Sequence, residues 1–168
     1  MGKKAALQIN DVTNRAGADA VTGIIHDAAL FRYLSDYEIE TLSPFLEYRR
    51  YKKGEVLFRE GDPGDFICFI SSGKMEITKK TLFKDKQVIL AVLAKGSLMG
   101  ERSIIDGKPR SATATALETS DILTLKSGLF EVLVEEHPNI AVKLLWSVVE
   151  ILNLRLDKAS DRIAAIVY

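Results

Sequence analysis

The residues best suited to bind a ligand lie close together, between positions 99 and 114. Gly100 lets the backbone approach a bound molecule closely or adopt a positive φ. The stretch Glu101–Ile105 fits one helical turn, whose free amide groups favour an anion. Arg110 supplies a planar fork of donors that suits a phosphate. The segment therefore predicts an anion site.

A carboxylate and small residues complete this segment. Glu101 is unsuited to phosphate but suited to accepting hydrogen bonds from sugar hydroxyls, as acidic residues do for ribose in dinucleotide sites. Ser111 adds a hydroxyl group, and Ala112 and Ala114 leave room above the strand. These groups together suit a compact sugar phosphate. The simpler alternative is an internal salt bridge between Glu101 and Arg110, but the agreement of the surrounding residues favours binding.

The composition excludes several other kinds of site. The 168 residues include one cysteine, Cys68, and two histidines, His26 and His137. These are too few for a disulfide framework, a four-cysteine metal site or the multi-histidine metal sites of small β-barrel enzymes. We therefore expect no metal and no cofactor, and we interpret Cys68 as a small core residue.

Charge and hydropathy narrow the class of protein. The 23 basic and 23 acidic side chains cancel, which argues against a surface that binds nucleic acid through its phosphates. No apolar run approaches the roughly 20 residues that a membrane-spanning helix needs. The N-terminus lacks the apolar core of a signal peptide. We expect a soluble cytoplasmic protein without a membrane span.

The elements that must position this segment are predicted as helices, then strands, then helices. Helical spacing marks Asn14–Ala29, and Ser35 with Glu38 forms a capping box that opens a second helix. The residues Asp62-Pro63-Gly64-Asp65 have the composition of a type II turn. Six runs rich in β-branched and aromatic residues predict the strands Val56–Arg59, Phe66–Ile70, Met75–Lys79, Gln87–Leu93, Ser111–Leu117 and Asp121–Leu125. Short strands at this spacing predict a small antiparallel barrel or jelly roll.

Helical periodicity returns after the strands. Ser127 is the expected N-cap of a helix that ends near Glu136, and Pro138 stands where a long C-terminal helix begins. That last helix carries a heptad pattern, which we call the α-helical seam: Leu145, Val149, Leu152, Leu156, Ala159, Ile163 and Ile166. The seam either packs on the protein's own barrel or forms a two-stranded dimer interface. Trp146 is interpreted as a packing residue.

The stretch Gly100-Glu101 followed by Pro109-Arg110-Ser111-Ala112-Thr113-Ala114 resembles the phosphate-binding cassette of cyclic nucleotide-binding domains. That family includes regulatory subunits of cyclic-AMP-dependent protein kinase, cyclic-nucleotide-gated channels and the bacterial catabolite activator protein. The stretches Gly54–Leu57, Glu60–Asp65 and Phe69–Glu76 are also similar to the family, in the family's order. The resemblance covers roughly residues 30 to 163.

The resemblance implies a jelly-roll barrel (a double-stranded β-helix) with flanking helices and the nucleotide held beneath the last helix. It implies that Glu101 accepts the ribose 2′-hydroxyl and that Arg110 pairs with the cyclic phosphate. The other ligand-binding residues that it implies are Gly100, Arg102, Ser103, Ser111 and Ala112. Arg102 departs from the family, which has an apolar residue there, and its role stays open between solvent contact, a salt bridge and added charge near the phosphate.

We expect two regions, an N-terminal helical segment (1–29) and a cyclic nucleotide-binding domain with its C-terminal helix (30–168). The expected function is that of a non-catalytic sensor in signal transduction, which binds cAMP in preference to cGMP. It acts as a homodimer through the C-terminal helix on a downstream protein that the sequence does not identify. Arg155, Lys158 and Arg162 form a basic stripe on that helix and are candidate contacts to the base.

Two other functions were weighed. A cupin-like small β-barrel enzyme would need histidines in the strand region, where there are none. A transcription factor of the catabolite-activator type would carry a helix-turn-helix module after the long helix, where this sequence ends at Tyr168. The sequence is therefore either a stand-alone module or a fragment of a longer protein.

Overall fold

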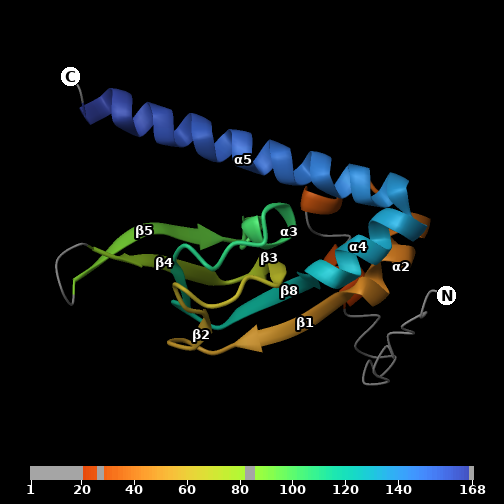
Figure 1. Ribbon diagram of the computed structural model, residues 1–168, viewed down its shortest axis with the longest axis horizontal. Coiled ribbons are helices and arrows are strands. Elements are labelled where there is room, and N and C mark those ends of the chain that lie inside the picture. The colour runs from red at the N-terminus through yellow and green to blue at the C-terminus, as the bar shows by residue number, and fades with distance from the viewer. Residues whose placement is uncertain (1–20, 26–28, 82–85, 167–168) are drawn as a thin grey trace.

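The computed structural model describes residues 21–25, 29–81 and 86–166. In this part of the chain, two four-stranded antiparallel sheets are flanked by helices, and a long helix runs across them (Figure 1). One sheet has the order β1-β8-β3-β6 and the other the order β2-β7-β4-β5. Neighbouring strands that are distant in the sequence are the mark of a jelly roll. The predicted fold class is confirmed.

The strands have short and regular bounds. They are β1 (Leu46–Tyr51), β2 (Val56–Phe58), β3 (Phe66–Ser72), β4 (Lys74–Lys80), β5 (Gln87–Ala94), β6 (Leu98–Met99), β7 (Thr113–Ala116) and β8 (Ser120–Lys126). All six predicted strands are confirmed, with ends that shift by one or two residues. The sequence missed β1, whose four central residues are all exposed, and β6, which is only two residues long. Neither segment shows the alternation that identifies a half-buried strand.

The predicted type II turn is three residues out of place. A type II turn needs a positive φ at its third residue, and Gly64 is not among the glycines with positive φ. The tight turn is instead Arg59–Asp62, where the Asp62 amide donates to the Arg59 carbonyl at 3.1 Å and Gly61 has φ +90°. Gly61 supplies the left-handed conformation that this turn requires.

The helices lie beside the sheets (Figure 1). They are α2 (Asp36–Leu42), α3 (Arg102–Ile105), α4 (Ser127–Glu136) and α5 (Pro138–Ile166), with the 3₁₀ turns η1 (Ala29–Phe31) and η2 (Ser43–Phe45). The capping box at Ser35 is confirmed, since both of its hydrogen bonds are present. The N-cap of α4 is Lys126, one residue before the predicted Ser127. Of the N-terminal helix expected over Asn14–Ala29, residues 21–25 are helical and most of the remainder lies outside the described residues.

Two apolar clusters hold the elements together. The larger one joins the β1-β8-β3-β6 sheet to the helices, including residues 21–25, whose Val21 and Ile25 are fully buried. The smaller one lies between the two sheets and includes Cys68, Met75, Ile122 and the small Ala114. Cys68 is thus a core residue, as predicted, and burial raises the pKa of its thiol.

The helix α5 buries a different face from the one that the heptad pattern marks. Its buried residues are Ile140, Ala141, Leu144, Ser147 and Val148. Most of the α-helical seam is exposed instead: Leu145 (37%), Val149 (49%), Leu156 (64%) and Ile163 (64%). Leu152 alone of the described seam side chains packs against the core. The alternative in which the seam packs on the protein's own barrel is therefore wrong, and so is the interpretation of Trp146, which is 66% exposed.

No helix among the described residues is long and apolar enough to cross a membrane.

Candidate functional site

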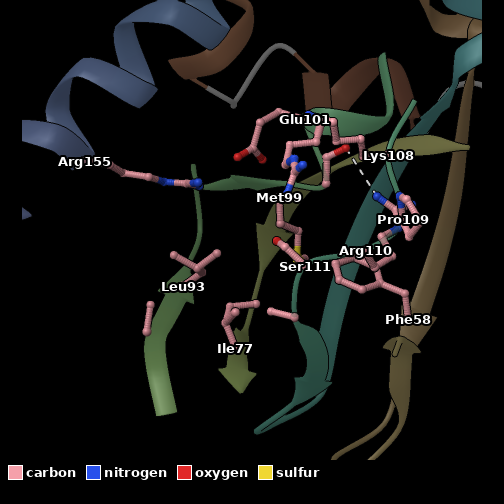
Figure 2. Close-up of a pocket in the computed structure, with 14 residues that line it drawn as sticks. Phe58, Ile77, Leu93, Met99, Glu101, Lys108, Pro109, Arg110, Ser111 and Arg155 are labelled. Carbon is pink, nitrogen blue, oxygen red and sulfur yellow. Dashed lines mark hydrogen bonds between the residues drawn. The ribbon is translucent and has the colours of Figure 1, made fainter. Parts of the chain in front are cut away.

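A cavity of about 190 Å³ opens beside the segment 99–112, between the β2-β7-β4-β5 sheet and α5 (Figure 2). Apolar side chains from the strands form one wall: Phe58, Ile77, Ala91, Leu93 and Met99. Six of the seven predicted ligand-binding residues form another wall, together with Lys108 and Pro109 of the same segment: Gly100, Glu101, Arg102, Arg110, Ser111 and Ala112. One cavity therefore has an apolar side and a charged side, which suits a ligand with an apolar ring and an anionic group.

The tight turn at residues 59–62 fixes the backbone of Arg110. Its amide donates to the Asp62 carbonyl at 2.8 Å, and its carbonyl accepts from the Gly61 amide at 2.9 Å. These two bonds dock the segment before β7 against the turn after β2. The Arg110 side chain, 6% exposed, then reaches into the cavity, where Nη1 donates to the Gly100 carbonyl at 3.3 Å (Figure 2).

The guanidinium of Arg110 is buried without an anionic partner. Its Nε and Nη2 atoms have no hydrogen-bond partner, and no ion pair with Arg110 occurs in the described part of the chain. Burial lowers the pKa of Arg110, although an arginine remains charged at neutral pH. Buried charges are normally paired. The site thus holds two unsatisfied donors and one positive charge where an anion would complete them.

Gly100 is needed because Arg110 occupies the space above it. Its φ is +77°, and a Cβ built on it would lie 2.2 Å from Nη1 of Arg110. Both the conformation and the contact exclude a side chain. The glycine therefore lets the backbone pass close to the guanidinium, as its position in the sequence predicted.

Glu101 points away from Arg110. It is the N-cap residue of α3, and its carboxylate lies on the side of the cavity toward Arg155 (Figure 2). No ion pair joins it to Arg110, so the salt-bridge alternative is wrong for these two described residues. The carboxylate and the guanidinium instead stand on separate parts of the cavity wall, as two groups of one ligand would require.

The remaining predicted residues differ in accessibility. The Arg102 side chain is 45% exposed and pairs with Asp106 at 3.5 Å, so it forms the salt bridge that was one of its three expected roles. Ser111 is exposed and Ala112 is buried, and both line the cavity. Ser103 lies in α3, and its side chain is outside the described residues.

Arg155 is the one described residue of α5 that lines the cavity. Its Nη2 donates to the Leu98 carbonyl, which lies just before the cassette. Burial lowers the pKa of Arg155, and the charge of Glu101 opposes this effect. Lys158 and Arg162, the other members of the basic stripe, are exposed and do not line the cavity. The sequence predicts the basic stripe, but it does not show which of the three side chains lines the cavity.

The apolar wall was not predicted as part of the site. Phe58, Ile77 and Leu93 lie on three different strands, and the sequence marks them only as members of strands. Their shared cavity results from the pairing of β2, β7, β4 and β5. Among the described residues no cluster of three or more His, Cys, Asp or Glu side chains is arranged to hold a metal ion.

The family model described as the cyclic nucleotide-binding domain matches residues 48–137, which include the whole cassette. The cyclic AMP receptor protein of Thermus thermophilus is 31% identical over 115 residues, which are 68% of this chain and 53% of that protein. A regulatory subunit of cAMP-dependent protein kinase from Debaryomyces hansenii is 34% identical over 65% of this chain and 23% of its own length. The chain thus spans about half of the first relative and a quarter of the second.

A solved structure supports the same relationship. The crystal structure of a cyclic nucleotide-binding domain from Methylobacillus flagellatus KT matches with a TM-score of 0.76 at 28% identity. The match covers 88% of this chain and 83% of that one.

Proposed function

The chain belongs to the cyclic nucleotide-binding domain family, and on that premise we propose that it is a non-catalytic sensor for a cyclic nucleotide, cAMP in preference to cGMP. One observation carries the proposal: the buried guanidinium of Arg110 has two unpaired donors in a cavity that otherwise has an apolar wall. A cyclic phosphate carries one negative charge, which matches this one unpaired guanidinium.

In the proposed complex, each group of the nucleotide meets a different part of the wall. Arg110 pairs with the cyclic phosphate, and Glu101 accepts a hydrogen bond from the ribose 2′-hydroxyl. Four of the other predicted residues, Gly100, Ser103, Ser111 and Ala112, form the shell along the phosphate and the sugar, whereas Arg102 stays paired with Asp106 at the cavity wall. The base lies against the apolar side chains of β4 and β5, where it displaces water from an apolar surface.

The preference for cAMP is supported by the two relatives described above, whose names refer to cAMP. The cavity also suits a guanine ring, so the preference must be measured. The cupin-like alternative has no support in the family match. The proposal also keeps two expectations that come from the sequence. One is the division of the chain between residues 29 and 30, and the other is a cytoplasmic location.

The signal is proposed to leave the cavity through α5. Arg155 joins this helix to the Leu98 carbonyl, and the described side chains that follow it, residues 156–165, are all exposed. Arg155 is thus the last described contact between α5 and the sheets. A ligand beneath Arg155 changes what holds the distal half of the helix, and a ligand can shift a conformation only through such differential contacts.

The exposed α-helical seam supports a homodimer. A helix that projects into solvent with large aliphatic side chains along one heptad face is only marginally stable by itself. Pairing of Val149, Leu156 and Ile163 with the same residues of a second copy would bury that face. The downstream protein on which such a dimer acts is not indicated.

Calorimetric titration of nucleotide-free protein with cAMP and with cGMP tests the proposed function. We expect one site per chain, tighter binding of cAMP, and no turnover of either nucleotide. Bound nucleotide is expected to stabilise the fold by about 2.7 kcal/mol at a hundredfold excess over Kd. It is also expected to slow amide exchange at residues 100–114 and in α5 from Asn153 onward. Absence of heat and of thermal stabilisation with both nucleotides would refute the proposal.

A further inference from the structure

The guanidinium of Arg110 lies against two aromatic rings. Its Cζ is 4.4 Å from the ring centroid of Phe58 and 4.2 Å from that of Phe66. The two rings are 6.3 Å apart and inclined by 61°. Phe58 ends β2 and Phe66 begins β3, which belong to different sheets. The arginine thus lies where the two sheets meet, with an aromatic ring from each of them against it.

Ring faces stabilise a cation without using its hydrogen-bond donors. The negative face of an aromatic ring attracts a guanidinium, and the attraction strengthens when the pair is removed from water. A carboxylate would also stabilise the buried charge, but it would occupy the same N–H groups that a phosphate needs. The rings therefore offset the cost of burial and leave the in-plane donors Nε and Nη2 unpaired.

The neighbouring groups do not compete for those donors. Asp62 and Asp65 influence Arg110 through their charges, but neither forms an ion pair with it. The thiol of Cys68 is fully buried, and because burial raises its pKa it stays neutral. The nearest polar contact of the side chain is the Gly100 carbonyl, which accepts from Nη1 on the opposite branch from Nη2. No described group therefore pairs with Nε or Nη2.

We propose that Phe58 and Phe66 are positioning residues that hold Arg110 ready for an anion before any ligand is present. The inference depends on the proposed function for the identity of that anion, the cyclic phosphate. Arginine has several rotatable bonds, and ordering such a side chain on binding costs about 0.5–1.5 kcal/mol. A guanidinium that is already ordered avoids this cost.

The first test needs no ligand. In the nucleotide-free protein, the Nε–Hε group of Arg110 should give one sharp NMR signal, shifted by the ring currents of the two phenylalanines and slow to exchange with water. Arg110→Lys identifies the signal by removing it. Phe58→Leu and Phe66→Leu should move it toward the position of a solvent-exposed arginine. A signal that is already at that position in the parent protein, or that stays unmoved in both variants, would overturn the proposal.

The second test measures coupling between the rings and the arginine. We expect Phe58→Leu and Phe66→Leu each to weaken cAMP binding roughly 2- to 12-fold, which corresponds to the ordering cost of one side chain. In an Arg110→Ala background the same substitutions should have less than a twofold effect, because the rings act through Arg110. Phe58→Tyr keeps the ring face and should restore most of the affinity.

Phe69→Leu is the matched control, because Phe69 is a buried phenylalanine that packs on Phe31 rather than on Arg110. It should lower stability but leave affinity within twofold of the parent. If all three leucine variants lose affinity equally, Phe58 and Phe66 are structural residues and the proposal that they position Arg110 is wrong. A parent protein that binds no cyclic nucleotide would refute the proposed function, while the ligand-free NMR signal would still decide whether the rings hold Arg110.

Discussion

Replacing Arg110 by methionine separates the stability of the free domain from its affinity for a nucleotide. In the free protein the guanidinium is buried with one hydrogen bond, at 3.3 Å to the Gly100 carbonyl, and with two unpaired donors. Exchanging buried charged groups for apolar ones of similar size is often neutral or stabilising by 1–4 kcal/mol. Loss of the ring contacts at Phe58 and Phe66 subtracts roughly 1–2 kcal/mol from that gain. We therefore expect the free energy of unfolding of Arg110→Met to lie between about 2 kcal/mol below and about 3 kcal/mol above that of the parent.

The affinity of Arg110→Met for cAMP should fall by much more than its stability changes. In the variant, a phosphate that enters the cavity loses its hydration but gains no ion pair with a cation. Removing one member of a desolvated charge pair costs about 2–5 kcal/mol, or roughly 30- to 5,000-fold in Kd. Stability is measured by urea denaturation without ligand, and affinity by calorimetric titration with cAMP. Thermal unfolding should show that excess cAMP stabilises the parent but not the variant.

The matched control is Arg102→Met, the same substitution at an arginine that also lines the cavity. Arg102 is exposed and pairs with Asp106, and such surface pairs contribute about 0–1 kcal/mol. It should alter neither stability nor affinity by more than a small factor. If Arg110→Met binds cAMP within threefold of the parent, Arg110 is not the phosphate partner. If it instead loses several kcal/mol of stability, Arg110 is a structural residue and the reasoning fails.

Three further predictions concern other parts of the molecule. Gly100→Ala should weaken cAMP binding at least tenfold by displacing Arg110, since its Cβ would lie 2.2 Å from Nη1; a calorimetric Kd equal to the parent's would contradict this. The double variant Leu156→Glu, Ile163→Glu should sediment as a monomer at tens of micromolar. Leu154→Glu, at an exposed position outside the seam, should remain a dimer. A parent protein that sediments as a monomer would refute the dimer. Asp121 accepts hydrogen bonds from Tyr48, Arg50 and Ser72, which lower its pKa to about 2. The stabilisation of the fold by ionised Asp121 is complete above the unfolded-state pKa near 4 and is lost as pH falls toward 2. Asp121→Asn should therefore remove about 1–2 kcal/mol of the pH dependence of the free energy of unfolding in urea between pH 5 and 2. An unchanged pH dependence would rule this out.

The cassette could be found in the sequence because its residues are contiguous. Gly100, Glu101 and Arg110 lie within one segment, and their chemistry follows from residue type: a permissive backbone, an acceptor and a planar donor. The six regular strands were also predictable, because each alternates or clusters β-branched residues between turns. The strand β1 was not, because four exposed residues in its centre give no periodic signal.

The sequence determined which residues can do chemistry, and the tertiary structure decided which of them meet. Phe58, Phe66 and Arg155 approach the cassette only because strand pairing and the docking of α5 bring distant segments together. The same holds for the helix α5, which has apolar residues on two faces. Periodicity alone cannot rank two apolar faces, since both satisfy helical spacing. The helix α4 and the turn η1, on which α5 packs, select the face with Ile140, Leu144 and Val148. The heptad seam is left at the surface because one helix can bury only one side against one neighbour.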